Sequence, residues 1–101
     1  MSWRNVYFVK PVGCDGPIKI GCSSNMRHRV AEMTTWSPIP LEIIAHFPGM
    51  PADEHALHRR FAALRLHGEW FSPGPDLLAF IAALDLPEST FILPEREGQA
   101  A

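Results

Sequence analysis

The hydrophobic and polar positions of the chain form short blocks that predict strands separated by helices. Residues 5–9 (NVYFV) and 41–47 (LEIIAHF) are rich in β-branched and aromatic side chains, which favours strands. Residues 17–22 (PIKIGC) predict a further short strand. They follow a proline- and glycine-rich turn over residues 11–16, so this strand is expected to run antiparallel to the first. These three segments predict a small sheet.

Apolar residues at helical spacing predict three helices. The first places Met26, Val30 and Met33 on one face, at i, i+4 and i+7, directly after a cluster of N-cap residues. The second has the strongest helical pattern of the chain, and the third is a short apolar segment with an acid near its start. The predicted helices cover residues 26–33, 54–66 and 76–84.

This order of elements predicts an α+β domain with a small three-stranded antiparallel sheet flanked by about three helices. Residues 67–75 are predicted to form a loop that carries aromatic side chains, and 89–94 either an edge strand or an extended packing segment. Residues 1–93 are expected to fold as a single domain, because the chain is long enough for only one modest core. Residues 94–101 are predicted to be a flexible C-terminal tail.

Composition narrows the class of protein. Apolar residues make up 47% of the 101 residues and charged residues 20%, as in ordinary globular domains. No apolar run approaches the roughly 20 residues that a membrane helix needs, and the N-terminus has no secretory pattern, which predicts a cytoplasmic protein. Cys14 and Cys22 lack the spacing of a metal site, so both are interpreted as structural or incidental thiols.

The charge is unevenly distributed along the chain. The formal net charge is −2, which argues against strong nonspecific binding to nucleic acid. Residues 1–75, however, carry eight bases and six acids, whereas residues 76–101 carry one base and five acids. The negative charge therefore lies at the C-terminal end, and the rest of the chain could still bind a polyanion.

Ionisable residues fall on helix faces that the apolar pattern predicts to be buried. Arg29 lies three residues after Met26, on the apolar face of the first helix, and Glu54 and His58 share a face of the second helix with Leu57. An unpaired buried charge costs several kcal/mol, so such groups are normally paired or line a cleft. Two explanations remain open here: a structural salt bridge between Arg29 and Glu54, or a polar site into which both faces open.

The strands add two residues to this set. Tyr7 and Lys19 could point toward the same helix-covered face of the sheet. A phenol, an ammonium, a guanidinium and a carboxylate together suit a phosphate group and a divalent cation. The guanidinium would bind phosphate oxygens in a fork, and a tyrosine or histidine could take the proton of an attacking water.

Four short motifs occur in order over residues 5–71, each on the expected element. They are Val6-Tyr7-Phe8-Val9, Lys19-Ile20-Gly21, Glu54-x-x-Leu57-His58-x-x-Phe61 and Gly68-Glu69-Trp70-Phe71, with Arg29 eight residues after Gly21. In this combination the chain resembles the GIY-YIG nucleases, and most closely their phage-ORF branch. The resemblance covers about two-thirds of the chain.

The resemblance implies a metal-dependent endonuclease that hydrolyses DNA phosphodiester bonds. Glu54 would hold Mg²⁺ or Mn²⁺, and a single carboxylate favours a single-metal mechanism. Tyr7, aided by His58, would activate water, and Arg29 and Lys19 would neutralise the charge of the transition state. Since no separate DNA-binding module is evident, selection of a target would need a homodimer or a larger host complex.

Other charged and aromatic residues have less specific interpretations. Glu69 is interpreted as structural, and Trp70 and Phe71 as core or cleft wall. Four further residues lie outside the apolar faces and are interpreted as solvated helix surface that can also contact backbone phosphates. These are Arg27, His28, Arg59 and Arg60.

A non-catalytic alternative also fits the residues. The first motif has Asn5 where the GIY-YIG pattern has glycine, and the second has Lys19 where that pattern has tyrosine. Tyr7 and His58 could be satisfied core residues, Lys19 a solvated strand residue, and Glu54 an acid that favours the helix dipole. The alternative is a catalytically weak or inactive module that binds nucleic acid or protein and keeps the fold.

Overall fold

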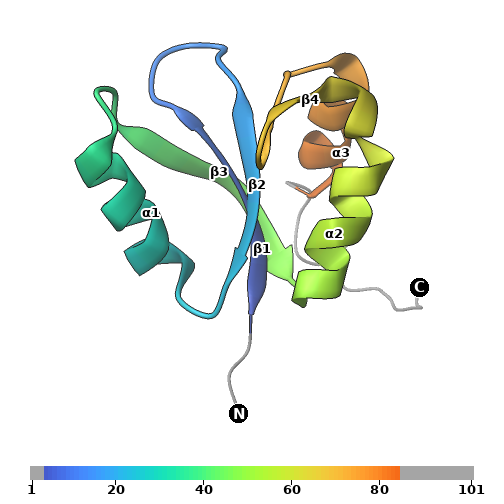
Figure 1. Cartoon of the computed structure of the whole chain (residues 1–101), viewed down its shortest axis with the longest axis horizontal. Coiled ribbons are helices and arrows are strands. Elements are labelled where there is room, and N and C mark those ends of the chain that lie inside the picture. The colour runs from blue at the N-terminus through green and yellow to red at the C-terminus, as the bar shows by residue number, and fades with distance from the viewer. Residues whose placement is uncertain (1–3, 85–101) are drawn as a thin grey trace.

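The computed structural model describes residues 4–84, and they form a five-stranded sheet with three helices (Figure 1). The elements in chain order are β1 (Asn5–Pro11), β2 (Ile18–Ser23), α1 (Met26–Trp36), β3 (Leu41–Pro48), α2 (Pro51–Arg60), a short 3-10 helix η1 (Ala62–Leu64), β4 (Arg65–His67), β5 (Trp70–Phe71) and α3 (Pro75–Leu84). The predicted segments 89–94 and 94–101 lie outside the described residues.

The sheet is antiparallel, with the strand order β3-β1-β2-β5-β4. β1 lies between β2 and β3, and its Tyr7 is paired with Gly21 of β2 and with His46 of β3. The prediction of a three-stranded sheet is therefore wrong, because the sheet has five strands. The α+β class and the three helices are as predicted.

The two additional strands arise from residues 65–71, which the pattern placed partly in a helix and partly in a loop. Gly68 has a φ of 58°, a left-handed conformation that glycine adopts at little cost, and this turn brings β4 and β5 together. β5 then pairs with β2 through Ile18 with Phe71 and Lys19 with Trp70. Strands of three and two residues are too short to show an alternating pattern, so the sequence did not reveal them.

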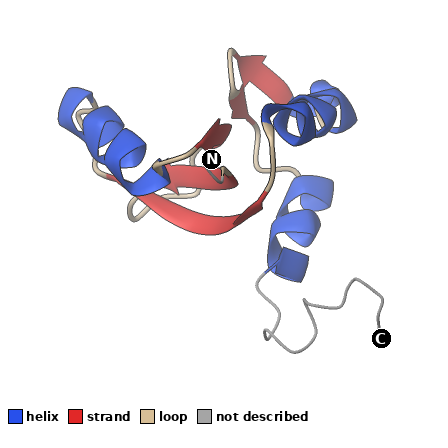
Figure 2. Ribbon diagram, turned by 90° about the horizontal axis from the view of Figure 1, so that it is seen from below, coloured by secondary structure: helices blue, strands red, loops and turns tan. Residues whose placement is uncertain are grey.

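Each face of the sheet has its own apolar cluster. Figure 2 shows the curved sheet with α1 on one side and α2 and α3 on the other. Because side chains alternate along β1, Tyr7 and Val9 pack with Val30 of α1, while Val6 and Phe8 face the opposite helices. That second, larger cluster comprises Val6, Phe8, Ile18, Ile20, Leu57, Phe61, Phe71, Leu77 and Ile81.

Helix α2 is shorter than the pattern predicted. It ends at Arg60, and η1 follows before the chain enters β4. Its start is fixed by Pro51 in the first turn and by Asp53, whose carboxylate accepts a hydrogen bond from the Met50 N–H at 2.7 Å. This start places Glu54 one turn into the helix. Within residues 4–84, no helix is long and apolar enough to cross a membrane.

Candidate functional site

Tyr7 lies on the α1 face of the sheet with its ring against β2. Only 2% of the residue is exposed. A Cβ added at Gly21 would lie 2.5 Å from the Tyr7 hydroxyl oxygen, so the absence of a side chain at Gly21 is what makes room for the phenol. The glycine of the Lys19-Ile20-Gly21 motif is thus required by contact with Tyr7.

Lys19 connects β2 to the turn between β4 and β5. Its ammonium forms an ion pair with the Glu69 carboxylate and lies 5.9 Å from the centre of the Trp70 ring. The backbone fixes Glu69 in the same place, because the Ile20 N–H donates a hydrogen bond to the Glu69 carbonyl at 3.0 Å. Lys19 is therefore held at the centre of the site rather than free in solvent.

Glu54 is buried at the start of α2, where only 7% of it is exposed. Burial raises the pKa of Glu54 above its ordinary value, and the nearby negative charge of Glu69 raises it further. The imidazole groups of His58 and His55 partly oppose this change. The position near the helix N-terminus also favours a carboxylate.

Glu54 of α2 and Glu69 of the turn before β5 lie close enough that each shifts the pKa of the other. Burial by itself would raise the pKa of Glu69, but the hydrogen bond and positive charge of Lys19 outweigh it and lower that pKa. The pair therefore holds a proton more readily on Glu54 than on Glu69. Glu69, interpreted from the sequence as structural, belongs to this site. Its position in the Gly68-Glu69-Trp70-Phe71 motif, beside the glycine of the turn, was the available signal.

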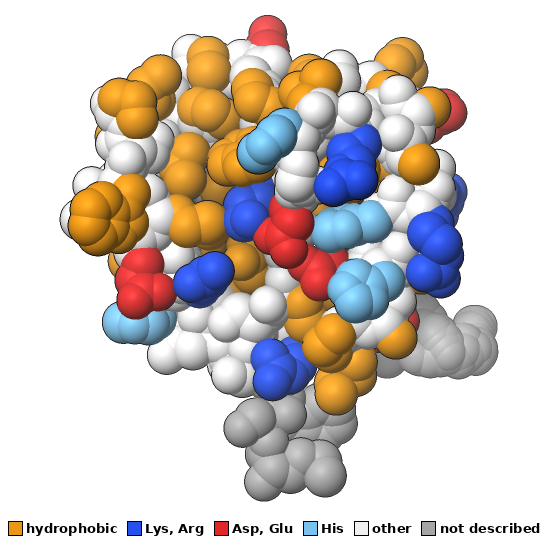
Figure 3. Space-filling view, viewed as in Figure 1, with side chains coloured by type: hydrophobic (Ala, Val, Ile, Leu, Met, Phe, Trp, Pro, Cys, Tyr) orange, Lys and Arg blue, Asp and Glu red, His pale blue; other side chains and the backbone are white. Residues whose placement is uncertain are grey.

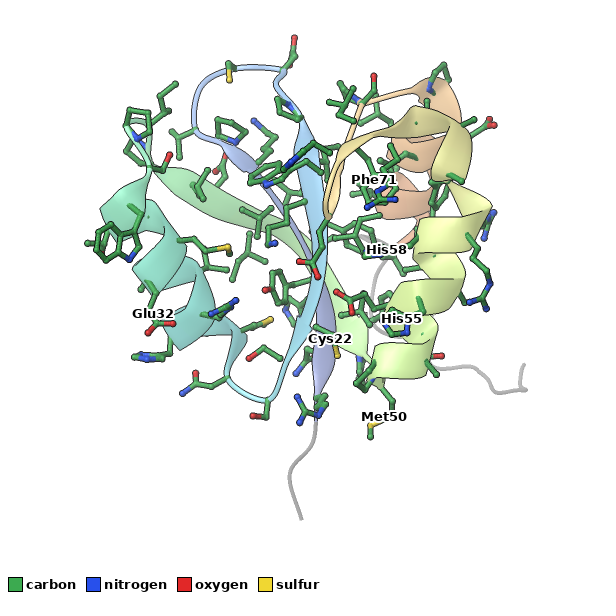
Figure 4. All side chains as sticks on the ribbon, viewed as in Figure 1. Cys22, Glu32, Met50, His55, His58 and Phe71 are labelled. Atoms are coloured by element: carbon green, nitrogen blue, oxygen red, sulfur yellow. The ribbon has the colours of Figure 1, made fainter. Side chains whose placement is uncertain are left out.

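His58 lies beside this pair. Its Nε2 is 3.0 Å from the Ile20 carbonyl oxygen and 3.9 Å from a Glu54 carboxylate oxygen. Its ring packs against Phe71, with 5.2 Å between the ring centres, and Figure 4 shows His58 directed from α2 toward β2 and Phe71. His58 is thus anchored by the backbone and adjoins Glu54.

Arg29 reaches the site from the opposite side, and it is not buried. Its side chain is 60% exposed, and its guanidinium lies 3.7 Å from Glu32 one turn along α1. The Arg29–Glu54 salt bridge, one of the two explanations that the sequence left open, is absent from the ion pairs of residues 4–84, because α1 and α2 lie on opposite faces of the sheet (Figure 2). Met26 and Val30 turn toward the sheet while Arg29 points to solvent at the edge of the helix.

Tyr7 is influenced by both sides of the site. Burial raises the pKa of Tyr7 above its ordinary value, and the charge of Glu69 adds to this effect. The positive charge of Arg29 acts in the opposite direction. The phenol is consequently protonated at neutral pH, and Arg29 is the group that favours its ionised form.

The four peripheral residues are not all brought to this site. His28 lies 3.5 Å from Glu32, and Arg27 and Arg59 are exposed on α1 and α2. The Arg60 guanidinium instead stacks over Phe61 and Phe80, 4.9 Å from the Phe80 ring centre, and so lies toward α3.

The surface view agrees with this grouping. Figure 3 shows lysine, arginine, acidic and histidine side chains gathered at the centre of one face, between α1 and α2, with apolar side chains beside them. The five predicted catalytic residues come from β1, β2, α1 and α2. His58 adjoins Glu54, and the charge of Glu54 acts on the pKa of Tyr7. Within the described part of the chain, Arg29 is linked to this group only through its effect on the pKa of Tyr7.

A family model for the T5orf172 domain matches residues 5–83, which is most of the chain. The chain belongs to the T5orf172 domain family. T5orf172 domains are phage-associated and nuclease-like, which is consistent with nucleic-acid binding or an endonuclease role. No curated protein and no solved structure matches the chain.

This match corrects the family expected from the motifs. The resemblance pointed to the GIY-YIG nucleases, whereas the T5orf172 match is to a different family and no GIY-YIG match is found. The motifs themselves remain structural features of this T5orf172 domain: Gly21 makes room for Tyr7, and Glu69 pairs with Lys19. Four short motifs were too little sequence to distinguish the families.

Proposed function

We propose that this T5orf172 domain is a metal-dependent endonuclease that hydrolyses DNA phosphodiester bonds. The observation that carries the proposal is the proximity of the Glu54 and Glu69 carboxyls, each of which shifts the pKa of the other, next to a buried phenol and the Lys19 ammonium that pairs with Glu69. Carboxylates forced together in a partly buried site favour either a shared proton or a cation between them. Phosphate groups and divalent cations suit the remaining side chains.

The donor set is compatible with Mg²⁺ or Mn²⁺. Among residues 4–84 there is no arrangement of three or more histidine, cysteine, aspartate or glutamate side chains that could enclose a metal. Mg²⁺ is commonly bound by one or two carboxylates, with waters and substrate phosphate oxygens completing its shell. Glu54 would hold the ion, with Glu69 as the second oxygen donor. The bound ion would supply Lewis-acid stabilisation of the phosphate charge.

The cationic side chains would bind the substrate phosphate. Arg29 is exposed and can rotate away from Glu32, so its guanidinium is available to phosphate oxygens. Lys19 is held by Glu69 and adds positive charge beside the same position. Both would stabilise the extra negative charge that develops on the phosphate in the transition state.

Tyr7 would activate the attacking water. In its ionised form, the phenolate oxygen would accept a proton of the water while the water oxygen bonds to phosphorus and the bond from phosphorus to the departing oxygen breaks, and the departing oxygen would take a proton from solvent. The positive charge of Arg29 lowers the pKa of Tyr7 and so favours the phenolate. A cation bound nearby would favour the phenolate in the same way. His58 lies close enough to Glu54 to adjust its charge.

A plasmid assay tests this function. Supercoiled plasmid is incubated with Mn²⁺ and the wild-type protein, Glu54→Ala or Glu42→Ala. Glu42 is a matched control, since it is an exposed carboxylate on β3 that forms an ion pair with Lys10 of β1. We expect cleavage by the wild type and by Glu42→Ala, and none by Glu54→Ala. Cleavage by all three proteins would contradict the role of Glu54.

One observation favours a second candidate, a binding module without catalysis. Lys19 is neutralised by Glu69, and Tyr7 holds its proton at neutral pH, so both groups are stable without a substrate. Absence of cleavage by the wild type, together with DNA binding that weakens as salt is raised, would support this module.

A further inference from the structure

An apolar groove adjoins the charged site on the face of the sheet covered by α1. It has a volume of about 400 Å³. It lies between the C-terminal end of α1, the loop that follows α1, Pro17 just before β2, and the strands β1, β3 and β5. Figure 3 shows apolar side chains gathered beside the central charged group. Its walls include Pro17, Met33, Trp36, Ile39, Leu41 and Trp70.

The composition of the groove indicates what it can bind. None of the lining residues is charged, and the Ser37 hydroxyl is already engaged by the Ile39 carbonyl. Trp36 is 86% exposed, so within residues 4–84 most of its large, flat indole faces water. Such a surface does not attract a phosphate, but it suits the flat face of an aromatic ring.

The groove and the charged site share a wall. Trp70 lines the groove, and the Lys19 ammonium lies over its ring while pairing with Glu69. A ligand in the groove would therefore sit next to whatever phosphate binds at Lys19. A nucleotide has both parts in this arrangement, an aromatic base attached to a phosphate.

From this continuity we infer that the groove binds an unpaired nucleobase of the strand whose phosphate lies at the charged site. The inference rests on the proposed function and names its substrate class: nucleic acid with an unpaired or flipped nucleotide beside the phosphate. Bases stacked in a duplex do not expose their faces, whereas unpaired bases stack readily on aromatic side chains. Trp36 and Trp70 are the stacking residues.

Binding without metal tests this inference separately from catalysis. The full-length protein is titrated, in buffer with EDTA, into three fluorescein-labelled probes: a short oligothymidylate, a strand of the same length with abasic sites, and a duplex. We expect the wild type to bind the oligothymidylate most tightly. Trp36→Ala should weaken that binding at least about fivefold and leave duplex binding unchanged. Trp36→Phe should retain most of it.

Leu66→Ala is the matched control, because Leu66 is an exposed apolar residue on β4 and does not line the groove. Equal affinity of the wild type for the oligothymidylate and the abasic strand would overturn the inference. The inference would also be overturned if the wild type bound neither strand. It would be overturned as well if the wild type were a dimer that Trp36→Ala dissociates and if the probes had no effect on that dimer, because Trp36 would then serve self-association. Because the assay contains no metal, its result stands whether or not the domain cleaves DNA.

Discussion

The carboxyl groups of Glu54 and Glu69 lie close enough to shift each other's pKa although they are 15 positions apart in the sequence and come from different parts of the fold. Glu54 is fixed by the start of α2, and Glu69 by the turn that Gly68 allows and by its ion pair with Lys19. Two acids so placed repel each other when both are ionised. This repulsion is costly for the fold alone, and the proposed cation between the two carboxylates would offset it.

Neutral substitutions of the two acids should change stability in opposite directions. Folding raises the pKa of Glu54. The Glu54 carboxyl therefore contributes to folding stability when the pH is below its unfolded pKa, and this contribution is lost as the pH rises through its folded pKa. For Glu69 the folded pKa is lowered, so its contribution is present above the unfolded pKa and is lost as the pH falls through the folded value. At neutral pH in EDTA, Glu54→Gln should raise the melting temperature and Glu69→Gln should lower it.

Thermal unfolding of both variants and the double variant, followed by circular dichroism, checks this prediction. Below the ordinary carboxyl pKa the advantage of Glu54→Gln should disappear, because the wild-type group is then protonated. A lower melting temperature for Glu54→Gln at neutral pH would contradict this prediction, because it would show that the ionised Glu54 carboxylate stabilises the fold.

A divalent cation should stabilise the wild-type protein through this pair. Binding to the folded state alone raises stability by about 2.7 kcal/mol when the free ligand is at 100 times its dissociation constant. Mn²⁺ should therefore raise the melting temperature of the wild type and of Glu42→Gln, but not that of Glu54→Gln. An equal increase for all three proteins would mean that the ion binds elsewhere.

The pH dependence of cleavage should report Tyr7. Burial and the charge of Glu69 raise the pKa of the Tyr7 phenol above its ordinary value. The fraction of phenolate therefore keeps increasing with pH until the pH exceeds this raised pKa. The cleavage rate should thus rise about tenfold per pH unit through the neutral and mildly alkaline range. Tyr7→Phe should cleave more slowly and lose this slope. A variant that keeps the wild-type slope would remove Tyr7 from the role of base.

Gly21 should not tolerate a side chain. A Cβ there would lie 2.5 Å from atoms of the buried Tyr7 ring, so Gly21→Ala must displace the phenol or part β1 from β2. Forced packing of this kind typically costs about 1–3 kcal/mol. Gly16→Ala is the control, since its Cβ would approach no atom closer than 3.2 Å. Urea denaturation should show a marked loss for Gly21→Ala and a small effect for Gly16→Ala; similar values would contradict the contact.

The sequence predicted the larger elements because their patterns are long enough to read. The strands at residues 5–9, 17–22 and 41–47 and the helix that begins after Asn25 lie close to their predicted positions. The strands β4 and β5 escaped prediction, because five paired residues around a glycine turn carry no periodicity. Which strands pair with which depends on the whole chain rather than on local pattern.

The candidate site was predicted in part. Tyr7, Glu54 and His58 were singled out because polar groups interrupted apolar strands or helix faces. In the structure His58 adjoins Glu54, and the charge of Glu54 acts on the pKa of Tyr7. The exposure of Arg29 was missed, because periodicity fixes the angle around a helix but not how closely that helix approaches the sheet. Glu69 was missed since its role depends on Lys19, a partner 50 positions away. The catalytic and metal roles themselves stay predictions.

The most direct test of the account is the Mn²⁺ dependence of DNA cleavage by the wild type and by Glu54→Gln, measured as single-turnover rates. The account predicts that the wild-type rate rises with Mn²⁺ and saturates, and that Glu54→Gln is slower by at least about 100-fold at every concentration, because the several kcal/mol supplied by the ion are lost. A Glu54→Gln protein that saturates at the same Mn²⁺ concentration and cleaves at the wild-type rate would contradict it.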